Sequence, residues 1–218
     1  MKDGKEFAIA EIPVGKLNAL VKNLMLQMNT ADPSEAVRLI NSGERVVSKP
    51  TCNWREQDGV IYLSVTSDGT TGPEWIKRLE KKSFRLSDYA KGIFRSSGFK
   101  PTKGVKYEIV ILKGLLFEDN DRITKNIRAE ADKRKLDKPN AEVTCLIREN
   151  FSDKDIEAMG LTWIVTMHEP IKDSDGALGL LDTDCGADGS GLDACYDSPG
   201  IRWDRERGFA FAVSQVSA

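Results

Sequence analysis

Apolar positions in the first half of the chain follow helical spacing first and strand spacing later. Residues 16–28 (KLNALVKNLMLQM) carry leucine, valine and methionine at helical intervals, which predicts a helix with one apolar face. A second short helix is expected within residues 32–44, with Asp32 or Ser34 as its N-cap. Residues 58–66 (DGVIYLSVT) are rich in β-branched side chains and predict a strand.

Two helices and a boundary are expected after this strand. In residues 70–82 (TTGPEWIKRLEKK), Thr71 and Glu74 have the spacing of a capping box, which predicts a helix start. Residues 86–99 (LSDYAKGIFRSSGF) predict a further helix. The segment 96–104 (SSGFKPTKG) collects glycine, proline, serine and threonine, and is therefore the predicted domain boundary.

The second half of the chain mixes strands and helices. In chain order we expect a strand at 105–113, a charged helix at 121–136, a helix at 141–150 capped by Asn140, a short helix at 152–160, a strand at 161–171 and a closing strand at 208–216. The strand at 161–171 is expected to be half buried. A long irregular segment is expected between it and the closing strand.

This order of elements predicts an α+β protein. Residues 1–50 are expected to form a helical N-terminal segment and residues 51–102 a small α/β module. Residues 103–218 are expected to form the domain that carries the function.

The composition is that of an ordinary globular protein, with 218 residues, 40% apolar, 30% charged and a formal net charge of -2. A chain with no basic stripe gives no electrostatic support for nucleic-acid binding. The first residues lack the apolar core of about 7–15 residues that marks a signal peptide. No apolar run approaches the roughly 20 residues that span a bilayer. We therefore expect a cytoplasmic protein that binds neither nucleic acid nor membrane.

Residues suited to metal or redox chemistry are few. The four cysteines are Cys52, Cys145, Cys185 and Cys195, and no CxxC occurs, which excludes a zinc ribbon. Without a secretion signal, free thiols are expected. His168 is the only histidine, so most histidine-based metal sites are excluded. We expect no metal and no cofactor.

Two chemical alternatives to a recognition function stay open. One is a calcium-dependent binding module that uses the aspartates of residues 182–197 (DTDCGADGSGLDACYD), although no EF-hand spacing fits: a loop that starts at Asp184 has Cys195 at its last ligand position. The other is a hydrolase with His168 as base. Its neighbour Glu169 points to the opposite face of a strand, so the two do not form a dyad. No GxSxG, Walker or GxGxxG motif occurs, so we expect no enzyme.

Residues 173–202 use a restricted set of amino acids. They contain no Lys, Glu, Gln, Met or Trp, and they hold seven aspartates against no glutamate, whereas the rest of the chain has 12 aspartates and 15 glutamates. Loops favour Asp and Gly, which explains part of this bias but not the missing Lys and Gln. The five absent residues are those that codons ending in a pyrimidine cannot encode. Randomising the first two positions of AAC or AAT codons gives this set of amino acids.

Adenine-directed randomisation of such codons is the mark of a diversity-generating retroelement. The segments VVSKPTCNWREQDGVIYLSVTSDGTTGPEWIKRLE, FRLSDYAKGIFRS, LTWIVTMHEPIKDSDG and RWDRERGFAFAVSQVSA resemble a family of uncharacterised Patescibacteria proteins, over most of the chain. The resemblance implies a retroelement variable protein with a C-type-lectin-like fold in residues 103–218. It implies a variable region at about 177–202, around a frame of Leu180, Leu181, Leu192, Tyr196, Pro199 and Trp203. The chain departs from that family at Gly191, where a tryptophan is expected, and has no asparagine in the run.

The function that the resemblance implies is recognition of an unknown ligand, expected to be a protein, by hypervariable surface loops on a rigid scaffold. The aspartates predict an acidic surface suited to a basic or donor-rich ligand. The apolar face of residues 16–28 is a candidate seam for a homo-oligomer. The expected variable, ligand-binding residues are Asp182, Thr183, Asp184, Cys185, Gly186, Ala187, Asp188, Ser190, Asp193, Ala194, Cys195, Tyr196, Asp197, Ser198, Gly200, Ile201 and Arg202.

Overall fold

The computed structural model describes residues 25, 30, 32–42, 53–173, 175–185 and 190–214. The chain divides into two compact units, Met1–Cys52 and Asn53–Ala218. In the first unit, helix α2 (Pro33–Asn41) begins after Asp32, whose carboxylate accepts a hydrogen bond of 2.9 Å from the Ser34 N–H. Asp32 is thus the N-cap of this predicted helix. The predicted helix at 16–28 and its candidate oligomer seam lie outside the described residues, apart from Met25, which is helical.

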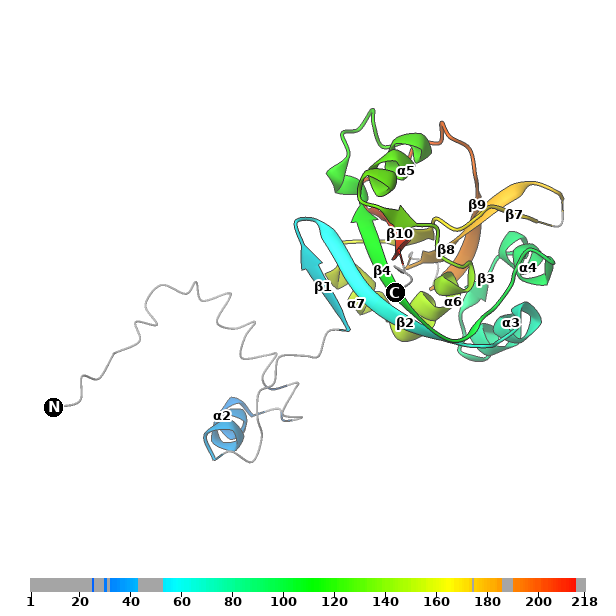
Figure 1. The fold of residues 1–218 in the computed structure, drawn as a ribbon. Coiled ribbons are helices and arrows are strands. Elements are labelled where there is room, and N and C mark those ends of the chain that lie inside the picture. The colour runs from blue at the N-terminus through cyan, green and yellow to red at the C-terminus, as the bar shows by residue number, and fades with distance from the viewer. Residues whose placement is uncertain are drawn as a thin grey trace. The chain divides into compact units, whose positions relative to one another are not determined.

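The second unit is a mixed α+β structure, as predicted, on one open sheet of ten strands (Figure 1). The strands are β1 (Trp54–Gln57), β2 (Val60–Asp68), β3 (Arg85–Leu86), β4 (Lys103–Lys113), β5 (Leu136–Asp137), β6 (Trp163–Thr166), β7 (Ile171–Lys172), β8 (Leu178–Asp184), β9 (Gly191–Tyr196) and β10 (Arg207–Val213). The main order is β1-β2-β4-β10-β6-β8-β9-β3, with β5 beside β10 and β7 beside β8. Only β10–β6 and β9–β3 are parallel among these pairs.

Helices cover both faces of the sheet. They are α3 (Gly72–Lys81), α4 (Asp88–Arg95), the short 3-10 helix η2 (Gly114–Leu116), α5 (Thr124–Lys133), α6 (Glu142–Asn150) and α7 (Asp153–Ala158). Buried side chains of α3, α4, α6 and α7 form the first core with one face of the sheet. Buried side chains of α5 form the second core with the other face. Figure 1 shows α5 apart from α3, α4, α6 and α7.

The central strands contribute to both cores at once. In β4, Ile111 belongs to the first core and Leu112 to the second, and in β6 the same holds for Ile164 and Val165. Strands with both faces covered read as continuous apolar runs rather than alternating ones. The prediction of a half-buried strand at 161–171 is therefore wrong for β6, of which three of four residues are buried and the fourth is half-buried.

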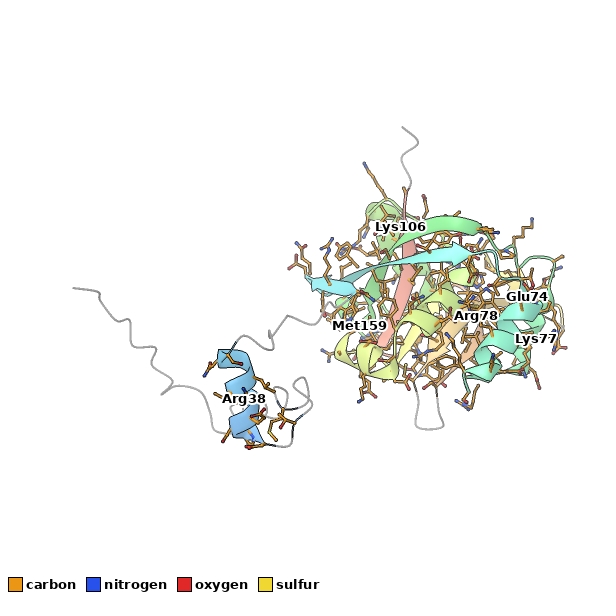
Figure 2. The ribbon with its side chains drawn as sticks, turned by 90° about the horizontal axis from the view of Figure 1, so that it is seen from below. Arg38, Glu74, Lys77, Arg78, Lys106 and Met159 are labelled. Carbon is orange, nitrogen blue, oxygen red and sulfur yellow. The ribbon has the colours of Figure 1, made fainter. Side chains whose placement is uncertain are left out.

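The predicted capping box at the start of α3 is confirmed. The Glu74 carboxylate accepts hydrogen bonds from the Thr71 N–H at 2.9 Å and from the Thr71 hydroxyl at 2.6 Å. The next residue, Gly72, lies against α4 and has no room for a side chain. A Cβ at this position would lie 1.8 Å from the carbonyl oxygen of Phe94. The polar side chains of α3, including Glu74 and Lys77, lie on its outer side (Figure 2).

Two predictions about the organisation of the chain are wrong. The segment 96–104 is not a domain boundary, because β2 pairs with β4 from Val60↔Leu112 to Asp68↔Lys103, so residues 53–102 share one sheet with the rest of the unit. The supposedly irregular segment after 171 holds an antiparallel pair, β8 and β9. Its many aspartates and glycines favour loops, and burial between two strands overrides that preference.

Candidate ligand-binding site

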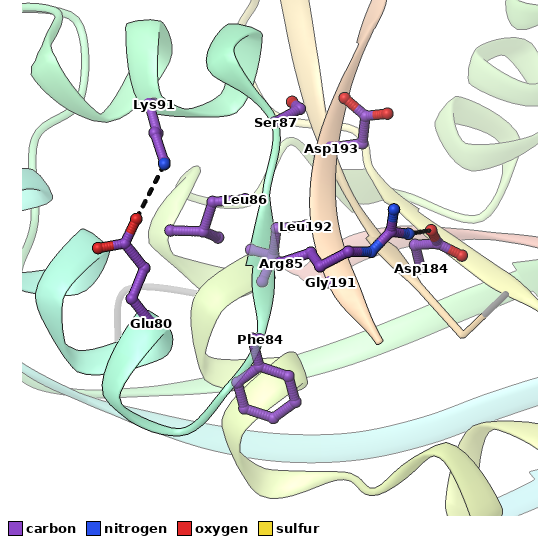
Figure 3. Close-up of a pocket in the computed structure, with 10 residues that line it drawn as sticks. All are labelled: Glu80, Phe84, Arg85, Leu86, Ser87, Lys91, Asp184, Gly191, Leu192 and Asp193. Atoms are coloured by element: carbon purple, nitrogen blue, oxygen red, sulfur yellow. Dashed lines mark hydrogen bonds and ion pairs between the residues drawn. The ribbon is translucent and has the colours of Figure 1, made fainter. Parts of the chain in front are cut away.

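Strand β9 lines two hollows of the surface, both next to α4. The first has a volume of about 390 Å³ and lies where β9 meets β3, the end of α3 and the start of α4 (Figure 3). Its lining residues are Glu80, Phe84, Arg85, Leu86, Ser87, Lys91, Asp184, Gly191, Leu192 and Asp193. The hollow therefore combines residues of the expected variable region with residues from a distant part of the chain.

Most of the charges around the first hollow are paired. Arg85 contacts the Asp184 carboxylate at 3.0 Å, and Lys91 contacts the Glu80 carboxylate at 2.8 Å (Figure 3). Asp193 accepts a hydrogen bond of 2.7 Å from the N–H of the next residue. No cation of the described residues forms an ion pair with Asp193. The hollow is thus left with an acidic group that a donor on a ligand can reach.

The second hollow is smaller, about 90 Å³, and aromatic. Tyr89 at the start of α4 and Tyr196 at the end of β9 line it, with exposed fractions of 49% and 63%. Tyr196 lies opposite Gly179 of β8, which has no side chain to fill the space. Ala194 also lines the hollow. Exposed tyrosines next to a hollow are typical of recognition surfaces, because they bring contact area at small cost in side-chain entropy.

Residues outside the variable region hold both ends of the segment 186–189. Arg148 of α6 is 1% exposed, and its guanidinium donates to the Cys185 thiol at 3.2 Å. It also forms an ion pair of 2.9 Å with Asp153, and the Asp153 carboxylate accepts a hydrogen bond from the Ser190 hydroxyl. Cys185 and Ser190 are therefore both bound to one ion pair of the scaffold, in which Arg148 is buried and Asp153 is partly exposed.

The last part of the expected variable region, residues 197–202, lies beside α5, on the other face of the sheet. Asp197 contacts Arg128 of α5 at 2.8 Å. The N–H of Thr124 donates to the Ile201 carbonyl at 3.2 Å. Cys195 likewise packs against the second core. The expected site residues therefore fall in two places, at the hollows beside α4 and along α5. Ser198, Gly200 and Arg202 are exposed at the second of these places.

The expectation of exposed contact residues is wrong for the end of β8. Asp182 is 2% exposed, Thr183 is fully buried and Asp184 is 7% exposed, because β8 is covered on both faces. Of these three, only Asp184 lines a hollow. The expected residues Gly186, Ala187 and Asp188 lie outside the described residues.

The surroundings of the Asp182 carboxyl group oppose its ionisation. Burial, and after it the charge of the nearby Asp193, raises the pKa of Asp182 from the ordinary 3.8 to about 7. Asp193 stands directly opposite Asp182 across β8 and β9. The Asp182 Oδ1 is buried and has no hydrogen-bond partner. This carboxyl group is thus held close to neutral at pH values below 7.

His168 is buried in the core, and both of its ring nitrogens have hydrogen-bond partners. It is 1% exposed, and burial lowers its pKa from 6.5 to about 4. Its Nδ1 lies 2.7 Å from the Glu169 carbonyl, and its Nε2 accepts the Leu181 N–H at 3.0 Å. The neutral ring with its proton on Nδ1 satisfies both bonds, so neither nitrogen is left for a substrate. This geometry supports the structural interpretation of His168 over the hydrolase.

Among the described residues, the thiols are unpaired and the carboxylates form no metal-binding cluster. Cys145, Cys185 and Cys195 are free thiols, as expected, and Cys52 lies outside the described residues. Burial raises the pKa of Cys185 to about 11, which disfavours its reactive thiolate. Within the described residues, no cluster of three or more His, Cys, Asp or Glu side chains could hold a metal ion. The same part of the chain has no helix long and apolar enough to cross a membrane.

Sequence reasoning missed the part of the site that α3, β3 and α4 supply. The missed residues are Glu80, Phe84, Arg85, Leu86, Ser87, Tyr89 and Lys91. They meet β9 through β3, which has two residues and pairs in parallel with Gly191 and Leu192. A strand this short leaves no periodic signal in the sequence. The pairing therefore could be seen only in the structure.

Known proteins do not add a family to this picture. Comparison of the chain with family models, with curated proteins and with solved structures finds no match. The interpretation of the site therefore depends on its residues and their arrangement.

Proposed function

We propose that this protein binds a ligand, expected to be another protein, through a surface built on β9, and that a retroelement diversifies residues 177–202. The function is recognition rather than catalysis. The observation that carries the proposal is the composition of the two hollows: each combines β9 residues with residues of a fixed neighbouring segment, 80–91. A ligand bound in either hollow contacts the variable strand β9 on one side and the constant segment 80–91 on the other.

The buried residues of the same region support this division of roles. Leu180, Leu181 and Leu192 are at most 2% exposed, and Trp203 is 7% exposed. These are frame residues that the resemblance implies should stay constant. Tyr196, another frame residue, is exposed instead and belongs to the contact surface. A scaffold whose core residues stay fixed can accept changes at its exposed positions without unfolding.

For the fold, we propose that residues 103–218 are a divergent C-type-lectin-like domain. The proposal is supported by β10, which returns to pair with β4 from Gly208↔Lys113 to Ala212↔Ile109, with α5 and α6 between them in the chain. Strands β1 and β2, which precede residue 103, extend the same sheet beyond the proposed domain.

DNA sequence tests the proposed diversification. We expect a reverse transcriptase gene near this gene, and a near-copy repeat that carries AAC or AAT where the variable region differs. Among close copies of the gene, differences should concentrate at positions that are exposed or only partly buried, such as Ser198, Asp193 and Ala194. They should spare the buried Leu181 and Trp203.

Two results would overturn the proposal. One is a set of close copies in which differences spread evenly over the chain. The other is a set in which residues 177–202 do not vary and no repeat or reverse transcriptase is found nearby.

A further inference from the structure

One edge of β9 is only half occupied. Strand β3 pairs with the first two residues of β9, and its main chain donates from Arg85 N–H to the Ser190 carbonyl at 3.0 Å and from Ser87 N–H to the Leu192 carbonyl at 3.2 Å. After Ser87 the chain turns into α4. From there on, no strand of the described residues continues the row that β3 begins.

The main-chain groups that come next on this edge are Ala194 and Tyr196. Main-chain groups of a strand alternate between its two edges, so residues 194 and 196 point to the same side as Ser190 and Leu192. The Ala194 N–H is bonded to the Asp193 carboxylate. Within the described part of the chain, no partner contacts the Ala194 carbonyl or the main-chain N–H and carbonyl of Tyr196.

The surroundings of this edge are aromatic and acidic. The half-exposed rings of Tyr89 and Tyr196 line the hollow beside it. The carboxylate of Asp193 has no ion-pair partner among the described residues, whereas Lys91, which lines the same hollow, is already paired. A ligand with positive charge therefore gains attraction here without displacing an existing ion pair.

We propose that an extended, basic peptide segment of the ligand adds as a strand to the edge of β9 at Ala194–Tyr196, in the row that β3 begins. The inference rests on the proposed function, because it names the class of partner for the same surface. A peptide N–H donates to the Ala194 carbonyl and a peptide carbonyl accepts the Tyr196 N–H. This mode suits a variable strand, since main-chain bonds stay the same when side chains change.

The test uses the full chain and a capped heptapeptide in which lysine alternates with valine or threonine. Binding is measured by two-dimensional amide NMR and by anisotropy of a labelled peptide at millimolar and lower concentrations. We expect shifts at the amides of Ala194, Cys195 and Tyr196. The same peptide with every amide N-methylated keeps its charge but loses its donors, and should bind at least about tenfold more weakly. A version with glutamate in place of lysine should also bind more weakly.

Two variants of one residue separate the main chain from the side chain. Tyr196→Ala removes the ring and keeps the N–H. Tyr196→Pro removes both, and its lost N–H is not part of the β8–β9 ladder. We expect Tyr196→Pro to weaken peptide binding several-fold beyond Tyr196→Ala. If the two variants have the same melting temperature, the fold is intact in both. If Tyr196→Pro melts at a lower temperature, the weaker binding of the N-methylated peptide tests the main-chain hydrogen bonds in its place.

Three outcomes overturn the strand-addition proposal: no binding at millimolar peptide, equal binding of the N-methylated peptide, or shifts confined to residues away from β9. If the DNA test succeeds and the peptide test fails, only this proposal falls. If peptide binds at β9 and the DNA test fails, the retroelement proposal falls and the peptide site remains.

Discussion

Replacing Asp182 by asparagine should stabilise the protein, and more so as pH rises. Asp182 is 2% exposed, and its pKa is raised to about 7 from the ordinary 3.8. A group with a raised folded pKa contributes stability that is fully present below pH 3.8 and is lost as pH rises through 7. That difference in pKa corresponds to about 4 kcal/mol at pH 8 and above. Asparagine has nearly the same shape and no ionisation, so Asp182→Asn avoids this loss.

The wild-type curve alone will hide the effect, because His168 titrates in the opposite direction. Its pKa is lowered from 6.5 to about 4, so its contribution is present above pH 6.5 and is lost as pH falls toward 4. The difference corresponds to about 3 kcal/mol. Between pH 4 and 7 the two groups nearly cancel in the wild type. In the Asp182→Asn variant only the histidine effect remains, and stability should fall clearly on acidification.

Urea unfolding at several pH values between 4.5 and 8 measures this, with Asp132→Asn as the matched control. Asp132 is an exposed carboxylate of α5, and its change to asparagine should leave the pH dependence unchanged. The gain from Asp182→Asn should be about 3 kcal/mol larger at pH 8 than at pH 4.5. Parallel curves for the wild type and Asp182→Asn would show that Asp182 is hydrated or ionised in the folded protein, and would refute the argument.

Three further variants, and a fourth that serves as a control for the first, test the scaffold. Gly72→Ala places a Cβ 1.8 Å from the Phe94 carbonyl oxygen and should lower the free energy of unfolding in urea by about 3 kcal/mol or more. The control, Gly200→Ala, places its Cβ in open space and should lower this free energy by less than about 1 kcal/mol. Arg148→Met removes the buried guanidinium that holds Cys185 and, through Asp153, Ser190. It leaves buried carbonyl acceptors without a donor and should cost about 1–3 kcal/mol. Hydrogen exchange at 185 and 190 should become faster, and unchanged exchange there would contradict this role. His168→Gln should destabilise the protein at pH 7.5. Because the Asp182 effect is then uncompensated, the stability of this variant should rise between pH 7.5 and pH 5, which thermal melts at the two pH values can check.

The sequence predicted the elements well where local signals were strong. The capping box of Thr71 and Glu74 and the N-cap of Asp32 occur as expected, because each depends on side-chain bonds within a few residues. The charged helix at 121–136 appears as α5, Thr124–Lys133. Its apolar residues are few, and one of them, Ile127, is fully buried in the second core.

The site was predictable only in part. The restricted composition of residues 173–202 drew attention to β9, which does line both hollows. It could not show that Asp182 and Thr183 lie inside the sheet, because aspartate and threonine are ordinary surface residues. It could not show Arg85 or Tyr89 either, since their contacts with β9 depend on long-range strand pairing.

Asp182 also bears on how a strand can be diversified inside a buried sheet. The two residues before Asp182 face different cores, Leu180 the second and Leu181 the first, so a change at the buried Asp182 also changes the interior of the protein. Under the proposed mechanism the unaltered codon at 182 encodes asparagine, and a change of its first base gives aspartate. That change puts an ionisable group where the interior opposes its charge, next to Asp193. Selection for stability would remove a buried aspartate. Random replacement of adenines produces it without regard to burial, and the rest of a large two-sided core then has to offset the lost free energy of unfolding.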